Sequence, residues 1–304
     1  MKESEITYHF NSISQLMKHA GHPPPLHPLV ALIDYGKTPF EVLKKGEKII
    51  LDFYKVSFKK SFKGRVRYGQ RYYDFDEGGL AFLKPNQVVF TPDDGSNYEG
   101  YAFYFHPDFI RHYPLGRAIN RYGFFSYAVD EALFLSAKEK EIISHLFYAI
   151  QSELDTNIDA FSQDVLVSQI EVLLNYSLRF YNRQFLTRKT VNHDIISSLD
   201  NVLTQYFEKS QGQQTGLPSV QYISLQLNVS ARYLSDMLRS LTGQTTQQYI
   251  QQAVIERSKD LLSTSSLSIA EIAYQLGFEH PQSFSKLFKS KTNLSPLAFR
   301  ATFN

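Results

Sequence analysis

The stretch 268–300 constrains the fold more than any other part of the chain, because it carries the signals of two short helices around a tight corner. Ser268 and Glu271 have the spacing of a capping box, and apolar residues follow at helical intervals. Gly277 can adopt the left-handed conformation that ends a helix. Pro281 suits the first turn of a second helix. The segment therefore predicts a compact helix-turn-helix unit.

The second of these helices has a buried face and an outward face of different character. Phe284, Leu287 and Phe288 fall on the inner side. The outward residues are polar or basic, namely Gln282, Ser283, Ser285, Lys286 and Lys289. A helix, a turn with glycine and a second helix with such a face are typical of a reader of the DNA major groove.

The same residues resemble the signature of the AraC/XylS family of transcriptional regulators. The matching elements keep the family spacing and are Ile269-Ala270-Glu271-Ile272-Ala273, Gly277-Phe278, Ser283-Phe284 with Phe288-Lys289, Ser295-Pro296 and Phe299-Arg300. Asn293 stands where the family usually has glycine, and Asn tolerates the left-handed conformation. The resemblance implies an α+β protein of two domains. These would be an N-terminal cupin-like β-barrel with a helical hairpin, and a C-terminal all-α domain with two helix-turn-helix motifs joined by a linking helix.

Length and composition agree with two globular domains. The chain has 304 residues, of which 43% are hydrophobic and 20% charged, and it contains no cysteine. Disulfides and thiolate metal sites are therefore excluded. No run of 18 apolar residues occurs, and the first ten residues lack the apolar core of a signal peptide. We expect a cytoplasmic protein without a membrane partner.

The distribution of charge says more than its sum. The whole chain carries a formal net charge of only +2, which by itself indicates no nucleic-acid partner. From residue 276 to the end, however, four basic residues (Lys286, Lys289, Lys291 and Arg300) face one acidic residue, Glu279. A basic C-terminal segment favours double-stranded DNA as the partner.

A further helix-turn-helix is predicted at about residues 218–242, ahead of the one at about 268–292. The run Ser230-Ala231-Arg232-Tyr233-Leu234-Ser235 resembles the first recognition helix of the family. Asp236 is a departure, since many relatives are basic there. Its carboxylate could accept a hydrogen bond from cytosine. The alternative is that it orients Arg232 or Arg239, which lie at helical spacing from it.

The segment 245–262 predicts the linking helix. About 18 residues at 1.5 Å each span about 27 Å, which suits two reading helices set about one DNA turn, 34 Å, apart. The family commonly has Arg at the position of Val254 and Ala at that of Ser258. These two departures leave the packing of this helix and any phosphate contact from it open.

The resemblance places DNA contacts on the outward residues of both recognition helices. They are Arg232, Ser235, Asp236 and Arg239 in the first, and Pro281, Gln282, Ser283 and Lys286 in the second. Gln282 can pair with adenine and Arg232 with guanine, whereas Lys286 or Lys289 suits phosphate. Plain solvation is the alternative for any of these side chains.

The first 132 residues predict a cupin-like β-barrel preceded by a flexible, polar N-terminal segment of about 45 residues. Short β-rich runs separated by glycine, proline and asparagine extend from Lys48 to His106. The segment 79–87 resembles part of the cupin-like barrel found in front of the DNA-binding half of many relatives. The many aromatic residues would either fill the core or line a small-molecule pocket inside the barrel. Its polar anchors would be Arg65, Arg67, Arg71 and Tyr72.

The sequence contains histidines that could bind a metal, but no motif that indicates an enzyme. Metal-binding cupins use a His-x-His pair, which the chain lacks, and it also lacks the common nucleophile and phosphate-loop motifs. We therefore predict no catalytic residue, no metal site and no cofactor. The histidines are interpreted as exposed or hydrogen-bonded; the clusters considered were His19, His22 and His27, and His106 and His112. A cupin-type enzyme with a DNA-binding appendage and a pure scaffold protein are the alternative functions.

The middle of the chain predicts a helical hairpin at residues 133–186. It either packs against the barrel or forms the interface of a homodimer. A polar, basic linker is expected at 187–194, followed by the DNA-binding domain at 195–304. The partners expected are DNA, an unknown small-molecule effector, a second copy of the chain and RNA polymerase.

Overall fold

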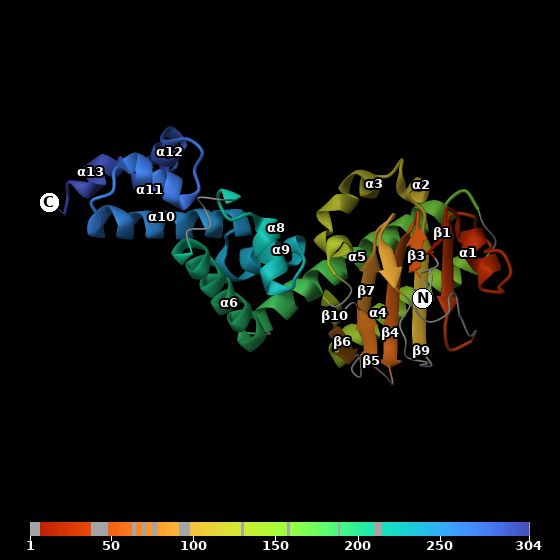
Figure 1. Ribbon diagram of the computed structural model, residues 1–304. Coiled ribbons are helices and arrows are strands. Elements are labelled where there is room, and N and C mark those ends of the chain that lie inside the picture. Colours follow the sequence, from red (N-terminus) through yellow and green to blue (C-terminus); the bar gives the residue numbers. More distant parts are fainter. Residues whose placement is uncertain are drawn as a thin grey trace, which may run out of the picture. The chain divides into compact units, whose positions relative to one another are not determined.

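The computed structural model describes residues 7–37, 48–62, 65–68, 71–74, 78–90, 98–128, 131–156, 159–187, 189–209 and 215–303. The chain divides into two compact units, Met1–Gln184 and Phe185–Asn304. The first unit is rich in strands and the second is helical (Figure 1). None of the helices in the described ranges is both long and apolar enough to cross a bilayer.

Two sheets and a separate hairpin make up the β part of the first unit. The strands are β1 (Thr7–Phe10), β2 (Val30–Asp34), β3 (Lys48–Leu51), β4 (Tyr54–Phe62), β5 (Arg65–Tyr68), β6 (Arg71–Asp74), β7 (Gly79–Leu83), β8 (Val88–Phe90), β9 (Tyr98–Phe105) and β10 (Leu133–Phe134). One sheet has the order β1-β3-β8, the other β10-β7-β4-β9-β2, and β5 pairs with β6. The β1–β3 pair is parallel, and the other pairs are antiparallel.

Period-two alternation gives the five-stranded sheet two different apolar faces. On one face Phe53 and Tyr104 meet edge to face, with ring centroids 5.8 Å apart. They belong to a buried cluster that also takes residues from β1, β2 and the helix α1 (Ile13–His19). On the other face the neighbouring residues Tyr54 and Phe105 stack with centroids 4.8 Å apart. The two faces thus pack against different parts of the unit.

Two long helices cover the second face of this sheet, and several short helices precede them in the chain (Figure 1). They are α2 (Pro107–Ile110), α3 (Pro114–Ala118), η1 (Ile119–Arg121), η2 (Gly123–Ser126), α4 (Ala137–Leu154) and α5 (Ser162–Thr187). Phe147 of α4 stacks on Phe58 and Tyr101, with centroids 5.5 and 5.4 Å away. Tyr181 of α5 stacks on Phe124, with centroids 5.5 Å apart. The helical hairpin of α4 and α5 therefore packs on the sheet, which was one of the two roles expected for it.

The start of α4 is held by a capping box and by an arginine from α5. The Ser136 hydroxyl accepts from the Glu139 amide, and the Glu139 carboxylate accepts from the Ser136 amide at 2.8 Å. Both hydrogen bonds of a capping box are therefore present. Arg183 donates from Nε to Glu139 at 3.0 Å and from Nη2 to the Phe134 carbonyl at 2.8 Å. This links the two helices to β10.

The prediction of a flexible N-terminal segment is wrong for residues 7–37, which form β1, α1 and β2. Phe10, Ile13 and Leu16 are buried there. The parallel pairing of Thr7 with Lys48 joins parts that are distant in sequence. The prediction failed because this segment is mostly polar, and only a few apolar residues attach it to the core. Residues 1–6 and 38–47 of it lie outside the described ranges.

The second unit consists of helices. They are α6 (Lys189–Glu208), α8 (Val220–Leu227), α9 (Ala231–Thr242), α10 (Thr246–Thr264), α11 (Ile269–Leu276), α12 (Pro281–Thr292) and α13 (Pro296–Arg300). The linker predicted at 187–194 is helical on both sides of residue 188, which lies outside the described ranges, because α5 extends to Thr187 and α6 begins at Lys189. That segment contains neither Pro nor Gly, so nothing in it stops a helix.

One helix, α10, supports the rest of this unit (Figure 1). It contacts α6, α9, α11 and α13. Its buried side is apolar apart from two small hydroxyl residues and consists of Thr246, Ile250, Val254, Ile255, Ser258, Leu261 and Leu262. Its 19 residues correspond to about 28 Å at 1.5 Å per residue, close to the length predicted for the linking helix.

Two glycine backbones touch where the turn after α11 meets the chain before α8. Gly277 has φ +97°, and a Cβ built on it would lie 2.4 Å from the Gly216 carbonyl oxygen. That carbonyl also accepts a hydrogen bond of 2.7 Å from the Tyr206 hydroxyl of α6. Glycine is therefore needed at position 277 for two reasons: its backbone is left-handed, and a side chain there would clash with Gly216.

We predict that Gly277→Ala lowers the free energy of unfolding by about 2–4 kcal/mol, from a φ penalty of about 1 kcal/mol plus the steric clash with Gly216. Gly243→Ala is the matched control, since Gly243 has φ +75° with no atom within 4 Å of the built Cβ. It should cost only the φ penalty of about 1 kcal/mol. Guanidinium titration compares the two, and equal losses would contradict the contact.

Candidate nucleic-acid interface

The first helix-turn-helix comprises α8 and α9. Asn228 ends α8 with φ 52°, and the Val229 amide donates to the Ser224 carbonyl at 3.0 Å. Ser230 then starts α9, its hydroxyl accepting from the Tyr233 amide at 3.1 Å. These local bonds set the corner, because they satisfy backbone groups that the helix ends leave unpaired. The helix-turn-helix predicted at about residues 218–242 is confirmed, with its corner at Asn228 and Val229.

The second helix-turn-helix comprises α11 and α12 and repeats this corner with a glycine. Gly277 ends α11, and the Phe278 amide donates to the Ala273 carbonyl at 2.9 Å. The capping box of Ser268 and Glu271 is present, with the Ser268 amide donating to the carboxylate at 2.7 Å. This hydrogen bond lowers the pKa of Glu271. Pro281 occupies the first turn of α12, as predicted.

The outward residues of α9 differ in exposure. Tyr233, Leu234, Met237 and Leu238 are its buried side. Arg232 and Arg239 are exposed, whereas Ser235 and Asp236 are half-buried. All four predicted contact residues thus lie on the side of α9 away from the core of the unit. The two arginines extend furthest into solvent.

An ion pair on this face explains Asp236. Arg232 Nε donates to Asp236 Oδ2 at 2.9 Å, one helical turn apart. The Asp236 side chain is 20% exposed and that of Arg232 is 43% exposed. Of the two roles considered for Asp236, the ion pair supports the orienting one, because the carboxylate fixes the guanidinium that lies one helical turn away.

The outward face of α12 is polar and carries only basic charges. Phe284 and Phe288 are buried, while Leu287 is only half-buried. Gln282, Ser283, Lys286 and Lys289 are exposed and Pro281 is half-buried. The helix carries three lysines and no acidic residue. Lys289 and Lys291 lie in its last turn, where a positive charge complements the helix dipole.

The two departures on α10 are resolved by burial. Val254 and Ser258 are 1% and 0% exposed, and the Ser258 hydroxyl donates to the Val254 carbonyl at 2.6 Å. Both side chains therefore belong to the core, and neither can reach a phosphate. Sequence reasoning left this open because the orientation of the helix was unknown.

The arginine that closes the family signature has a structural role. Arg300 Nε donates to the Leu262 carbonyl near the end of α10 at 3.3 Å. The adjacent Phe299 packs edge to face on Phe288, with centroids 5.4 Å apart. Together they fix α13 on α10 and α12, so Arg300 supports the second recognition helix from behind.

A polar contact between α6 and α10 escaped the sequence analysis. Tyr249 of α10 donates its hydroxyl to Asp200 of α6 at 2.8 Å. Burial, reinforced by this hydrogen bond and the Asp200 charge, raises the pKa of Tyr249 to about 12. No sequence signal marked this pair, because its members lie on helices that are not neighbours in the chain.

The candidate effector residues lie on the β5–β6 hairpin. Arg67 pairs with Tyr72, Tyr68 with Arg71, and Arg65 with Asp74 in its register. The backbone thus brings Arg65, Arg67, Arg71 and Tyr72 onto one two-stranded element. Their side chains lie outside the described part of the structure, so the effector assignment stays a prediction.

Three of the five histidines considered as ligands make other contacts in the described structure. His19 packs against Tyr8 and Phe10, with ring centroids 4.8 and 5.2 Å away. His27 packs edge to face on Phe109. His106 caps α2, its Nδ1 accepting from the Asp108 amide at 3.2 Å. Within the described ranges, no three His, Asp or Glu side chains cluster as metal ligands would.

Two family models match the chain, one in each unit. The model described as an AraC-like ligand binding domain matches residues 63–164. The model described as a helix-turn-helix domain matches residues 223–302, which contain α9 to α13. The chain belongs to the AraC/XylS family of transcriptional regulators. The family suggested by the signature at 268–300 is confirmed.

Curated relatives of this AraC/XylS chain match it over only part of their length. The Msm operon regulatory protein of Streptococcus mutans is 41% identical over 78 residues, 26% of this chain and 28% of that protein. The transcriptional activator RhaS of Klebsiella pneumoniae is 30% identical over 152 residues, half of each chain. The matched part thus spans half or less of these relatives.

Solved structures include the DNA-binding domain of AdpA in complex with a target DNA. It is 27% identical and covers 34% of this chain and 91% of that chain, with a TM-score of 0.30.

We predict that Tyr249→Phe lowers the free energy of unfolding by about 1 kcal/mol at neutral pH, the typical net worth of one hydrogen bond. Because the folded pKa of about 12 exceeds the ordinary value of 10.0, this contribution is present below about pH 10 and lost as the pH rises through 12. Tyr148→Phe, at a hydroxyl on a side chain that is 70% exposed, should change nothing. Chemical denaturation at pH 7 and pH 11 measures both, and a difference that grows with pH would contradict the assignment.

Proposed function

We propose that this AraC/XylS chain is a sequence-specific transcriptional regulator in which α9 and α12 enter neighbouring major grooves. The observation that carries the proposal is that α10, which is buried along one side, contacts both helix-turn-helix units, the first through α9 and the second through α11. A stiff support of about 28 Å suits reading helices separated by about one turn of DNA, roughly 34 Å. Control by a small molecule in the first unit, a cytoplasmic location and a non-enzymatic role complete the proposal.

Each exposed residue has a defined role in this proposal. Gln282 offers an amide that can bond both N6 and N7 of adenine, and Arg232 offers two donors to guanine. Lys286 and Lys289 contribute charge toward phosphates, which gives affinity without sequence information. Ser235, Arg239, Pro281 and Ser283 complete the contacting faces.

We expect Gln282→Ala to relax sequence preference at one operator position, with a loss of about 1–3 kcal/mol for the preferred base. Lys289→Ala should weaken all sequences alike and reduce the salt slope by about one unit. Binding is measured by fluorescence anisotropy on operator and mutated duplexes over a range of salt concentrations.

Matched controls come from exposed residues outside the proposed faces. Gln247→Ala on α10 should preserve both specificity and affinity. Lys138→Ala, on α4 in the other unit, should preserve the salt slope. If the Gln282 and Lys289 variants behave as their controls do, α12 is not the reading helix.

Homodimerisation is proposed through the outer side of α5. Phe161, directly before α5, and Val165 and Val172 within it stand at helical spacing and are 70%, 39% and 41% exposed. Apolar side chains repeated along one exposed side of a helix favour a partner helix. A dimer would place two DNA-binding units on one operator, next to RNA polymerase as a further partner.

We predict that Val172→Glu yields a 35 kDa monomer in sedimentation at micromolar concentration, because a charge in an apolar interface is costly to bury. Asn182→Glu, at an exposed polar position of the same helix, should leave the oligomer unchanged. A wild-type chain that sediments only as the monomer would remove the dimer from the proposal.

A further inference from the structure

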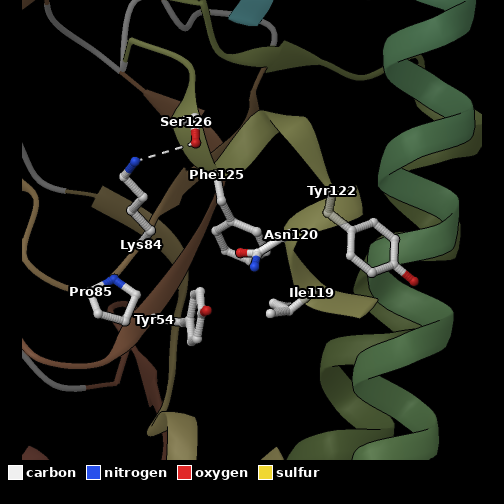
Figure 2. A pocket seen from close by; sticks show the side chains of 8 residues that line it. All are labelled: Tyr54, Lys84, Pro85, Ile119, Asn120, Tyr122, Phe125 and Ser126. Carbon is white, nitrogen blue, oxygen red and sulfur yellow. Dashed lines mark hydrogen bonds between the residues drawn. The ribbon is translucent and has the colours of Figure 1, made fainter. Parts of the chain in front are cut away.

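A pocket opens on the helix-covered side of the five-stranded sheet, away from the buried cluster between the sheets. Its volume is about 240 Å³. Figure 2 shows its lining, which is Tyr54, Lys84, Pro85, Ile119, Asn120, Tyr122, Phe125 and Ser126. Sites for drug-sized ligands occupy about 300–1,000 Å³, so this pocket suits a smaller molecule. It is distinct from the β5–β6 hairpin, where the sequence placed its effector candidates.

Aromatic rings give the pocket a fixed floor. Tyr54 stacks on Phe105 at 4.8 Å and meets Phe125 edge to face at 5.0 Å, both between ring centroids. Tyr122 turns its hydroxyl away toward α5 (Figure 2), where it donates to Asn175 at 3.0 Å. Only the apolar ring of Tyr122 therefore remains for the pocket. Because these rings are already fixed in place, the entropy cost of binding a ligand on this floor is lower.

A tight turn places the single cation of the lining. Pro85 at the second position and Asn86 with φ 64° at the third have the pattern of a type II turn, in which the Gln87 amide donates to the Lys84 carbonyl at 3.4 Å. The Asn86 amide also donates to the Leu51 carbonyl at 2.7 Å, which ties the turn to the end of β3. The backbone that carries Lys84 is thus anchored on two sides.

Three polar groups of the lining are left with bonding capacity. In the described ranges, the Lys84 ammonium has no carboxylate within ion-pair distance, and its one contact is the Ser126 hydroxyl at 3.4 Å. No hydrogen bond reaches the Tyr54 hydroxyl or the Asn120 amide from the residues that the structure describes. An ammonium, a phenol and an amide around an aromatic floor match an anion that also carries hydroxyl groups.

We propose that this pocket binds a small hydroxylated carboxylate, with the carboxylate paired to Lys84 and the hydroxyls bonded to Tyr54 and Asn120. Flat faces of the ligand would lie on the rings of Tyr54 and Phe125. Binding itself is independent of the DNA-binding proposal. Only the step by which the ligand alters DNA binding rests on the proposed function.

The test is isothermal titration of the full chain with D-glucuronate, D-gluconate and quinate. D-Glucose, the neutral counterpart of glucuronate, and butyrate, a carboxylate without hydroxyls, are the comparison ligands. We expect saturable binding of at least one hydroxylated carboxylate, at least about tenfold tighter than either comparison ligand, because glucose lacks the charge-assisted bond to Lys84 and butyrate lacks the hydrogen bonds to Tyr54 and Asn120. Failure of all three to bind saturably at millimolar concentration overturns the proposal.

Variants locate the site. Lys84→Met should weaken the bound carboxylate at least about tenfold, whereas Lys138→Met, at an exposed lysine on α4, should not. Asn120→Ala lies at an exposed position that is safe for folding and should weaken hydroxylated carboxylates but leave butyrate unchanged. Affinities that neither Lys84→Met nor Asn120→Ala alters overturn the assignment to this pocket.

Operator binding is measured on the same preparations with and without the bound carboxylate. Intact DNA binding without any carboxylate binding removes the pocket proposal and leaves the regulator. Carboxylate binding by a chain that does not bind DNA supports the pocket and removes the regulator.

Discussion

The buried side of α10 is the constraint on which the DNA-binding unit depends. Ile250, Val254 and Ile255 near its middle and Leu261 and Leu262 near its end face the core, while α9 contacts the same helix as α11 and α13. Neither helix-turn-helix has enough apolar surface to fold alone, because each consists of two short helices. A shared helix therefore determines both the stability of each corner and the direction in which each recognition helix faces. The contact between Gly277 and Gly216 closes this arrangement from the other side.

Local features of this chain were readable from the sequence, because their causes lie within a few residues. Capping at Ser136 and Ser268, the left-handed residues Gly277 and Asn293, and the alternation around Tyr54 all follow from short spacings. For the same reason the outer sides of α9 and α12, and the inner side of α12, were predicted nearly residue by residue.

Features set by distant partners were not readable. The pairing of Thr7 with Lys48 ordered a segment predicted to be flexible. Tyr249 found its partner in Asp200 on another helix. The turn at Lys84 was recognised only as punctuation between strands, because its role at the pocket depends on η1 and η2, which approach it only in the folded unit. Each of these features depends on which residues come close together in the folded chain, and residue type alone does not determine this.

The ion pair between Arg232 and Asp236 makes the two recognition helices electrostatically unequal. On α9 the two arginines are offset by one carboxylate, whereas α12 carries three lysines with no acid. Fewer counterions would leave the DNA when α9 docks than when α12 does. Under the proposed function, the part of the DNA affinity that comes from α12 should therefore fall more steeply with rising ionic strength than the part that comes from α9.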